Sequence, residues 1–494
     1  MRGTALRTDG DLAGRTSRGA VVTLAGELGV KLLAMAVTVL VAIRLDANAY
    51  GIVLMAIAAQ GLADVLTNPM LATVLVREPR LLSRRVDIAW TIAVARGALL
   101  TTAFWYLAPS ITAWLGAVEV LTDYLRLLAF AFALTGLVNL HAVQLRRELR
   151  FLPAFLLESV SPLTTSAFAL AALLFSPEPI WLIVAHLAGP LVGALSSLLL
   201  IAPRPRLVFA PAESIALLSG AAPLLLNGVL GYLLLAGDAI FVGYLAGATA
   251  LGIYGIGQRW SQLPMKMVAQ GLQSVLMPVY AVMRDDPART RNLVTSALGT
   301  MMAVIGLLAG LMLAFAGDFF RLLGGGGWSG AGAVAGAFAP FVLAFAVNAC
   351  LGPVLVVHGK LPWLNRIMAV QAVCFVPALY LGHAALGLPG AALSVSATAV
   401  GISVAMMVLC GRLLDLPMRT FGRVLVPPLA TAAVAVAFGW SVVAGLNDPR
   451  LRIWLGSATA IAVFVVSWEV LCRQAVTQSL RPRSLLQLGR MLAR

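Results

Sequence analysis

The sequence has little charge, little cysteine and few histidines, and each shortage excludes a class of protein. Charged residues make up only 11% of the 494 positions, against 61% hydrophobic ones, with a mean hydropathy of +0.95. This balance excludes a soluble fold. The four cysteines lie inside apolar stretches, where they form neither a disulfide framework nor a zinc spacing, and the four histidines are scattered. We therefore expect no metal and no cofactor.

The chain also lacks motifs for nucleotide hydrolysis and room for a soluble catalytic domain. The glycine run Gly324–Gly327 leads into Trp328, and the Gly359-Lys360 pair is followed by Leu361 rather than by serine or threonine, so neither is a P-loop. The loops are all short. A membrane enzyme such as a polysaccharide polymerase or ligase would normally carry a large periplasmic loop with arginine and histidine clusters. We expect a protein that is not an enzyme.

Long apolar stretches fill the sequence instead. A helix needs about 20 apolar residues to cross the hydrocarbon core of a bilayer, and the chain offers fourteen such stretches. The expected fold class is therefore an all-α polytopic membrane protein. The stretches lie near residues 19–43, 50–76, 87–108, 119–141, 152–175, 180–202, 214–240, 249–283, 294–316, 333–357, 363–384, 388–411, 422–445 and 451–472.

The net charge of +15 is distributed in a way that argues against nucleic acid as a partner. Basic residues gather in alternate loops, for example Arg84-Arg85, Arg146-Arg147 and Arg204 to Arg206, and the intervening loops hold few. The positive-inside rule makes the basic loops and both termini cytoplasmic, which agrees with an even number of spans. The scarcity of lysine, three against 32 arginines, indicates a bacterium with GC-rich DNA. We expect a multi-pass protein of the bacterial inner membrane.

A polar stripe interrupts the apolar stretch from Leu251 to Met283. Five side chains recur at steps of 3, 4, 4 and 3 and so lie on one helical face, within about 80° of one another. Cations at the bilayer centre cost about 2.5–3.5 kcal/mol each on insertion scales, so they normally face a watery cavity or a counter-ion. We predict that the stripe binds an anionic substrate. Its members are Arg259, Gln262, Lys266, Gln270 and Gln273.

Other intramembrane charges could extend this site or neutralise it. Glu27 and Lys31 are four residues apart and are either a self-neutralising helix pair or, respectively, a coupling site and an extension of the cationic stripe. Asp64, which shares a predicted face with Gln60 and Asn68, and Asp238 are either coupling sites or counter-ions. In the second case each would neutralise a cation of the stripe.

An internal repeat divides the predicted spans into two lobes. Residues 45–52 (Leu-Asp-Ala-Asn-Ala-Tyr-Gly-Ile) match residues 245–253, and each copy joins a long apolar helix to one that carries polar residues. Both copies start from the same side of the membrane, as in transporters built from parallel repeats. We predict a six-helix lobe over residues 1–206, a second over 207–420, and two extra helices with a basic tail over 421–494.

Several motifs resemble a known family. They are residues 237–245 (Gly-Asp-Ala-Ile-Phe-Val-Gly-Tyr-Leu), residues 251–254, Gln258-Arg259, Leu263-Pro264, residues 275–280 and 284–287, Tyr50-Gly51, and residues 144–151. With these the sequence resembles the polysaccharide transporter family of Wzx-type lipid-linked oligosaccharide flippases, within the superfamily that also holds multidrug antiporters and lipid II flippases. Asp238 and Arg259 match family positions, whereas apolar residues 233–237 replace the family's polar run.

The resemblance implies an architecture and a function. Two six-helix lobes form a V around a central cationic cavity, with two further C-terminal helices. The substrate is an undecaprenyl-pyrophosphate-linked oligosaccharide, moved to the periplasmic leaflet for exopolysaccharide, O-antigen or capsule synthesis. Membrane lipids, a polysaccharide polymerase and export proteins are the implied partners. The alternatives are a lipid II flippase and a cation-coupled multidrug antiporter that would use Glu27, Asp64 or Asp238.

Overall fold

The computed structural model shows helices joined by turns and short connecting segments, with no strand among the residues that it describes. These are residues 9–78, 82–148, 150–265 and 286–468, with residues 268, 276–277, 279–280 and 283–284 in addition. The chain divides into two compact units, the first containing residues 1–45, 52–232 and 482–494, and the second residues 46–51 and 233–481. The lobe boundaries expected near residues 206 and 420, and the V with its cavity, stay predictions.

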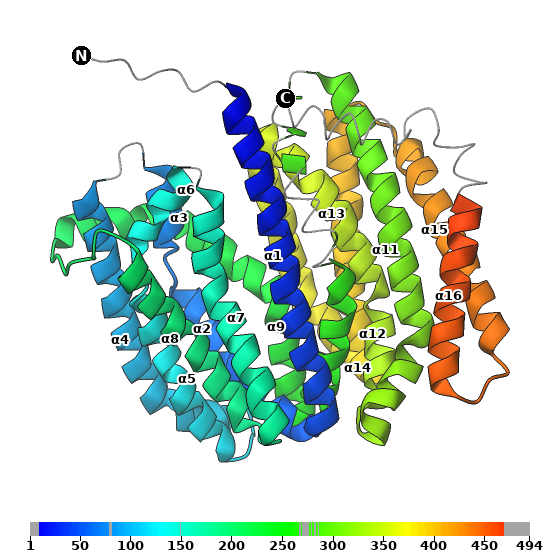
Figure 1. Ribbon diagram of the computed structural model, residues 1–494, viewed down its shortest axis with the longest axis horizontal. Helices are drawn as coiled ribbons and strands as arrows, with labels where there is room; N and C mark the ends of the chain where they lie inside the picture. Colours follow the sequence, from blue (N-terminus) through cyan, green and yellow to red (C-terminus); the bar gives the residue numbers. More distant parts are fainter. Residues whose placement is uncertain are drawn as a thin grey trace. The chain divides into compact units, whose positions relative to one another are not determined.

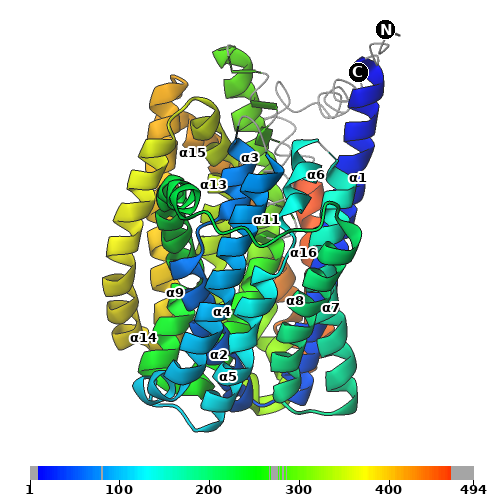
Figure 2. The ribbon, with the colours of Figure 1, turned by 90° about the vertical axis from the view of Figure 1, so that its left-hand side faces the viewer.

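The first unit is built mostly from long antiparallel helices. α4 packs against α5, α7 packs against α1 and α8, and α5 also packs against α8 (Figure 1). Short helices α3 and α6 lie together near the start of α4 (Figure 2). The elements are α1 (Asp9–Arg44), α2 (Ala47–Thr67), α3 (Leu71–Arg77), α4 (Ser83–Trp114), α5 (Val120–Gly136), η1 (Leu140–Ala142), α6 (Val143–Arg147), α7 (Phe151–Phe175), α8 (Ile180–Leu200) and the first part of α9 (Pro211–Pro264).

Small residues allow these helices to approach closely. A Cβ atom on Gly97 of α4 would lie 2.6 Å from the carbonyl oxygen of Phe132, and one on Gly136 of α5 would lie 2.6 Å from that of Ala93. Membrane helices associate through such close packing because lipid offers no hydrophobic driving force between them. Glycines at these two positions therefore set the spacing of α4 and α5.

The second unit holds the remainder of the helices. α11 packs against α12, α13, α15 and α16, and α13 packs against α14. In Figure 1 the ribbons of α11, α15 and α16 run side by side. After α9 the elements are α11 (Pro287–Gly324), η3 (Gly325–Trp328), α12 (Ala331–Ala337), α13 (Ala339–Val357), α14 (Leu361–Leu413), α15 (Met418–Val443) and α16 (Pro449–Ser467).

Two glycines bend helices where the sequence predicts that one span ends and the next begins. Gly247 interrupts α9 with φ 82°, and Gly387 interrupts α14 with φ 66°. Only glycine adopts such left-handed conformations without steric cost. The predicted boundaries between 240 and 249 and between 384 and 388 thus fall at these kinks.

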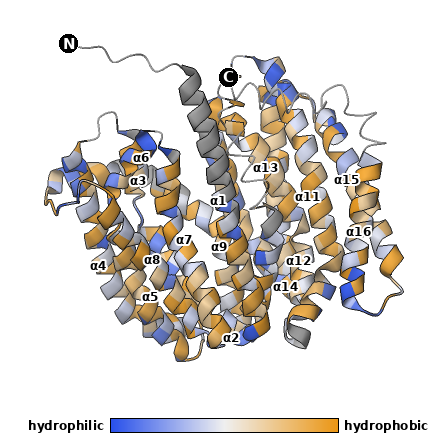
Figure 3. Cartoon of the chain, viewed as in Figure 1, coloured by the Kyte–Doolittle hydropathy of each residue, from blue (hydrophilic) through white to orange (hydrophobic). Residues whose placement is uncertain are grey.

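The helices are long and apolar enough to cross a membrane. Ten helices of the described residues pass this test, or eleven if the bent pair Val120–Gly136 and Leu140–Arg147 forms one span. Hydrophobic colour dominates the helices of both units (Figure 3). The all-α polytopic fold is therefore confirmed, and the full count of fourteen spans stays a prediction.

Candidate functional site

The kink at Gly247 positions a polar network in the second unit. The chain reverses there, so Asp238 before the kink meets Tyr254 and Gln258 after it, although 16 and 20 residues separate them. Arg259 follows directly. Sequence reasoning found Asp238 and Arg259 but missed the roles of Tyr254 and Gln258, because a helical wheel of one segment does not show what faces it across a turn.

Asp238 is a buried carboxylate held by neutral donors. The residue is only 1% exposed. One oxygen accepts hydrogen bonds from the Tyr254 hydroxyl at 2.7 Å and from Gln258 Nε2 at 2.6 Å, and the other accepts from the backbone N–H of Ala239 at 2.9 Å. The described structure thus does not show Asp238 as an ion-pair partner of Arg259. The reason is geometric, since the carboxylate points at Tyr254 and Gln258, which satisfy it.

Arg259 is exposed and lies against an aromatic ring. Its guanidinium carbon is 5.6 Å from the centroid of the Tyr50 ring, a distance at which a cation is attracted to the ring face. Tyr50 is buried and packs edge to face with Trp328, with centroids 6.2 Å apart. Within the described residues the Arg259 side chain has no acidic partner. Its five N–H donors can therefore serve a ligand.

Of the four other residues of the predicted stripe, the structure describes one, Gln262. Gln262, about one turn after Arg259, is only 7% exposed, because this side of α9 packs inward together with the fully buried Ser261. The hydrated surface expected at Gln262 is therefore not found. Lys266, Gln270 and Gln273 lie outside the described residues, and their role as binding residues stays a prediction.

Two acids of the first unit have cationic neighbours of their own. Glu27 lies 3.7 Å from Lys31, which favours the self-neutralising pair over separate roles. Asp64 pairs with Arg96 of α4 at 2.6 Å, and Arg96 also donates to the Asp64 carbonyl oxygen at 2.7 Å. Of the two alternatives for Asp64, a coupling site or a counter-ion of the stripe, neither included Arg96 as its partner. The sequence signal for this pair was the presence of opposite charges, Asp64 and Arg96, in consecutive predicted spans.

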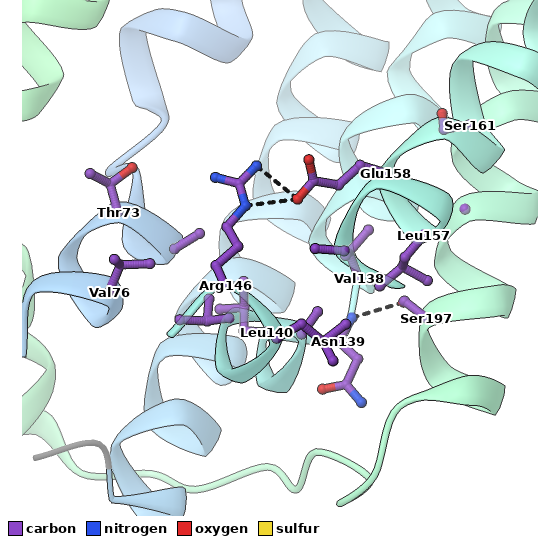
Figure 4. A pocket seen from close by; sticks show the side chains of 16 residues that line it. Thr73, Val76, Val138, Asn139, Leu140, Arg146, Leu157, Glu158, Ser161 and Ser197 are labelled. Carbon is purple, nitrogen blue, oxygen red and sulfur yellow. Dashed lines mark hydrogen bonds and ion pairs between the residues drawn. The ribbon is translucent and has the colours of Figure 1, made fainter. Parts of the chain in front are cut away.

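A pocket of about 580 Å³ opens in the first unit between α3, α6, α7 and α8. Figure 4 shows the side chains of Arg146 and Glu158 pointing toward each other at this pocket. Arg146 Nη2 lies 2.7 Å from a Glu158 oxygen, and both side chains are more than half exposed. The buried Asn139, at the start of η1, donates its backbone N–H to Ser197 Oγ at 3.0 Å, and both residues line the pocket. The pocket wall is thus tied together by its own polar groups.

Equivalent positions of the predicted repeat meet in the second unit. A Cβ atom on Gly51 would overlap the carbonyl oxygen of Ala248, and one on Gly252 would overlap that of Ala47. In the repeat, Gly51 corresponds to Gly252 and Ala47 to Ala248, so the two contacts are reciprocal. The hydroxyl of Thr249 adds a 3.3 Å hydrogen bond to Asn48. This reciprocity supports the repeat inferred from the sequence.

Within the described residues no three histidine, cysteine or acidic side chains are grouped so that they could hold a metal ion. The polar network around Asp238 lies in a region of the sequence that matches a known family. The profile of the family described as "Polysaccharide biosynthesis protein" matches residues 40–332, more than half of the chain. The chain belongs to this polysaccharide biosynthesis family. The matched region includes Asp238, Tyr254, Gln258 and Arg259.

Solved structures with the same fold are membrane transporters and flippases. The structure titled lipid II flippase MurJ, in an inward closed conformation, superposes with a TM-score of 0.77 at 12% identity and covers 92% of this chain and 100% of its own. An inward-facing multidrug resistance MATE family transporter of the MOP superfamily gives 0.61 at 15% identity, with 80% and 98% covered. The Vibrio cholerae MATE transporter VcmN gives 0.54 at 16% identity, with 83% and 99% covered.

No curated protein sequence matches this chain. At such low identities the structural likeness establishes the fold alone. The polysaccharide biosynthesis protein is thus an integral membrane protein with the fold of MOP-superfamily transporters.

Proposed function

We propose that this protein moves undecaprenyl-pyrophosphate-linked oligosaccharides from the cytoplasmic to the periplasmic leaflet of the bacterial inner membrane. The glycan would serve exopolysaccharide, O-antigen or capsule synthesis. The observation that carries the proposal is Arg259, an exposed guanidinium on an apolar helix of a polysaccharide biosynthesis family member, without an acidic partner in the described residues. Such a cation in a membrane helix is a functional-site candidate.

The chemistry of the headgroup fits a cationic binding residue. A pyrophosphate carries negative charge, and its polyprenyl tail can stay in the lipid while the protein shields the head. An arginine–phosphate contact at 4 Å is worth about 4 kcal/mol at an effective dielectric of 20, before desolvation is subtracted. An inside-negative potential favours outward movement of an anion by about 2.3 kcal/mol per charge per 100 mV. Transport by this route needs no nucleotide hydrolysis.

Two alternatives have different substrates. A lipid II flippase is the second candidate, because the structure with that title has the highest TM-score among those compared above. A cation-coupled multidrug antiporter is the third, since two of the structures are MATE transporters. A cationic drug should prefer an acidic site, whereas the exposed group here is the arginine, and Asp238 is buried among its own donors. The oligosaccharide therefore fits better.

Substitution of Arg259 in cells tests the proposal. In a deletion strain, Arg259→Ala should lower periplasmic arrival of the lipid-linked glycan by about tenfold or more, equivalent to about 1.4 kcal/mol. Arg259→Lys keeps the charge and should retain part of the activity. Arg204→Ala is the matched control, because Arg204 is an exposed arginine in a predicted cytoplasmic loop outside the family motifs.

The readout is leaflet-resolved analysis of lipid-linked glycans at equal membrane abundance of each variant. If the Arg259→Ala variant delivers as much lipid-linked glycan to the periplasmic leaflet as the wild type, Arg259 has no binding role. Normal arrival of every glycan in the deletion strain would overturn the flippase function itself. Retention of lipid II alone in the cytoplasmic leaflet would identify the second candidate.

A further inference from the structure

A second polar cavity lies in the second unit, away from the network around Asp238. It measures about 510 Å³ and opens between the start of α11, the turn before α15, the first turns of α15 and the residue that follows α16. No residue of α9 belongs to its described lining. The lining residues are Ala288, Arg291, Asn292, Thr295, Gly299, Leu416, Thr420, Arg423, Val424, Pro428 and Trp468.

Two arginines give this cavity a positive charge that the described structure does not neutralise. Neither Arg291 nor Arg423 has a side-chain ion pair or hydrogen bond within the described residues, and none of the described lining residues is acidic. By contrast, Arg289 on the same helix pairs with Asp286 at 3.4 Å. Two guanidiniums that line one cavity repel each other, and an anion between them offsets this repulsion by attracting both. Planar guanidiniums match phosphate oxygens especially well.

The other side of the same cavity is apolar. Leu416, Val424 and Pro428 contribute hydrocarbon, and the half-buried Trp468 stacks on Phe464 with ring centroids 5.8 Å apart. A tryptophan in such a place is typical of the boundary between lipid and water. The cavity therefore offers a cationic part and an apolar part, which suits an amphiphile better than a free ion.

The cavity lies on the side of the membrane where anionic lipids are expected. Arg291 and Arg423 lie near the starts of α11 and α15, within two clusters of basic residues (Arg284 to Arg291 and Arg412 to Arg423) that the positive-inside rule assigns to the cytoplasm. Anionic phospholipids give the cytoplasmic leaflet its negative surface potential, and basic pockets between helices on that side bind their headgroups. The extra helices α15 and α16 form part of the cavity, so a bound lipid would contact them and α11 together.

We propose that this cavity binds the phosphate of an anionic membrane phospholipid, held by Arg291 and Arg423, with Trp468 and the apolar wall against its glycerol and upper acyl chain. The site is separate from the proposed substrate site and does not depend on the flippase function. It would fasten the two C-terminal helices to α11 at the cytoplasmic boundary.

Native mass spectrometry of the purified full-length protein tests the site with phosphatidylglycerol and phosphatidylethanolamine as probes. We expect the wild type to retain phosphatidylglycerol about tenfold more tightly, and Arg291→Gln with Arg423→Gln to lose that preference. The control, Arg289→Gln with Arg419→Gln, removes the same charge from the same two helices outside the cavity lining. Equal retention of phosphatidylglycerol by the two double variants would overturn the proposal.

A parallel measurement with inorganic phosphate distinguishes the source of the phosphate group. If lipid-free protein binds phosphate through both arginines and shows no preference for phosphatidylglycerol, the cavity is a free-anion site and the lipid proposal is wrong.

Should the double variant not fold, fluorescence quenching by brominated phosphatidylglycerol replaces it. The proposal requires a saturable component of quenching in the wild type that Trp468→Phe removes. Quenching that is the same in both proteins would contradict it.

Discussion

At the scale of single residues, the two charged residues that match family positions, Asp238 and Arg259, have opposite surroundings. Asp238 is buried and accepts three hydrogen bonds, whereas Arg259 is exposed, lies over an aromatic ring and has no acidic partner among the described residues. Asp238 is therefore suited to organising the turn around Gly247, and Arg259 to meeting a ligand. Whether Asp238 also couples transport to an ion stays a prediction.

The hydrogen bonds of Asp238 lead to a prediction about stability. Its two oxygens accept from three donors, and asparagine would replace one acceptor with an NH₂ donor. Asp238→Asn should therefore destabilise the protein by about 1–3 kcal/mol, because at least one buried donor loses its acceptor. Tyr254→Phe removes a single donor and should cost about 1 kcal/mol.

Thermal unfolding of both purified variants in the same detergent provides the measurement. The melting temperature should fall in the order wild type, Tyr254→Phe, Asp238→Asn. An Asp238→Asn protein as stable as the wild type would show that the network is not held by the carboxylate.

At the scale of helices, the close approach at Gly51 and Gly252 has no room for a side chain. A Cβ at either position would overlap a carbonyl oxygen of the facing segment. Gly51→Ala and Gly252→Ala should each destabilise the protein by about 1–3 kcal/mol, through the backbone shifts that overpacking forces. The reciprocal geometry further predicts similar losses for the two substitutions.

Gly401→Ala in α14 is the matched control, because nothing lies within 4 Å of the Cβ it would add. This variant should be as stable as the wild type or slightly more stable, since alanine favours helix over glycine. Thermal unfolding again gives the comparison. Unchanged stability of Gly51→Ala and Gly252→Ala would contradict the close packing.

The same elements show how far sequence reasoning reaches. Apolar length predicted the helices, and the boundaries at Gly247 and Gly387 follow from short interruptions between long apolar stretches. The sequence did not predict which side chains pair between different helices. The pairing of Asp64 with Arg96 and the burial of Gln262 depend on which helix packs against which face, and helical periodicity alone does not state that.

At the scale of the whole molecule, family and fold point to one kind of activity. The polysaccharide biosynthesis profile covers residues 40–332, and the compared structures with this fold are transporters or flippases. The sequence resemblance had already indicated this superfamily. The substrate was not decided by the fold, because the same architecture is found in structures titled as lipid and as multidrug transporters.

Reconstitution of the purified protein into liposomes tests the central claim most directly. The vesicles contain an undecaprenyl-pyrophosphate-linked oligosaccharide in both leaflets, and a membrane-impermeant glycosidase outside consumes every sugar that reaches the outer leaflet. We predict that wild-type protein makes the inner-leaflet pool accessible, while vesicles with Arg259→Ala keep most of it protected, as protein-free vesicles do. An inner pool that stays protected with folded wild-type protein, under an imposed membrane potential of either sign and with proton or sodium gradients, would contradict the account.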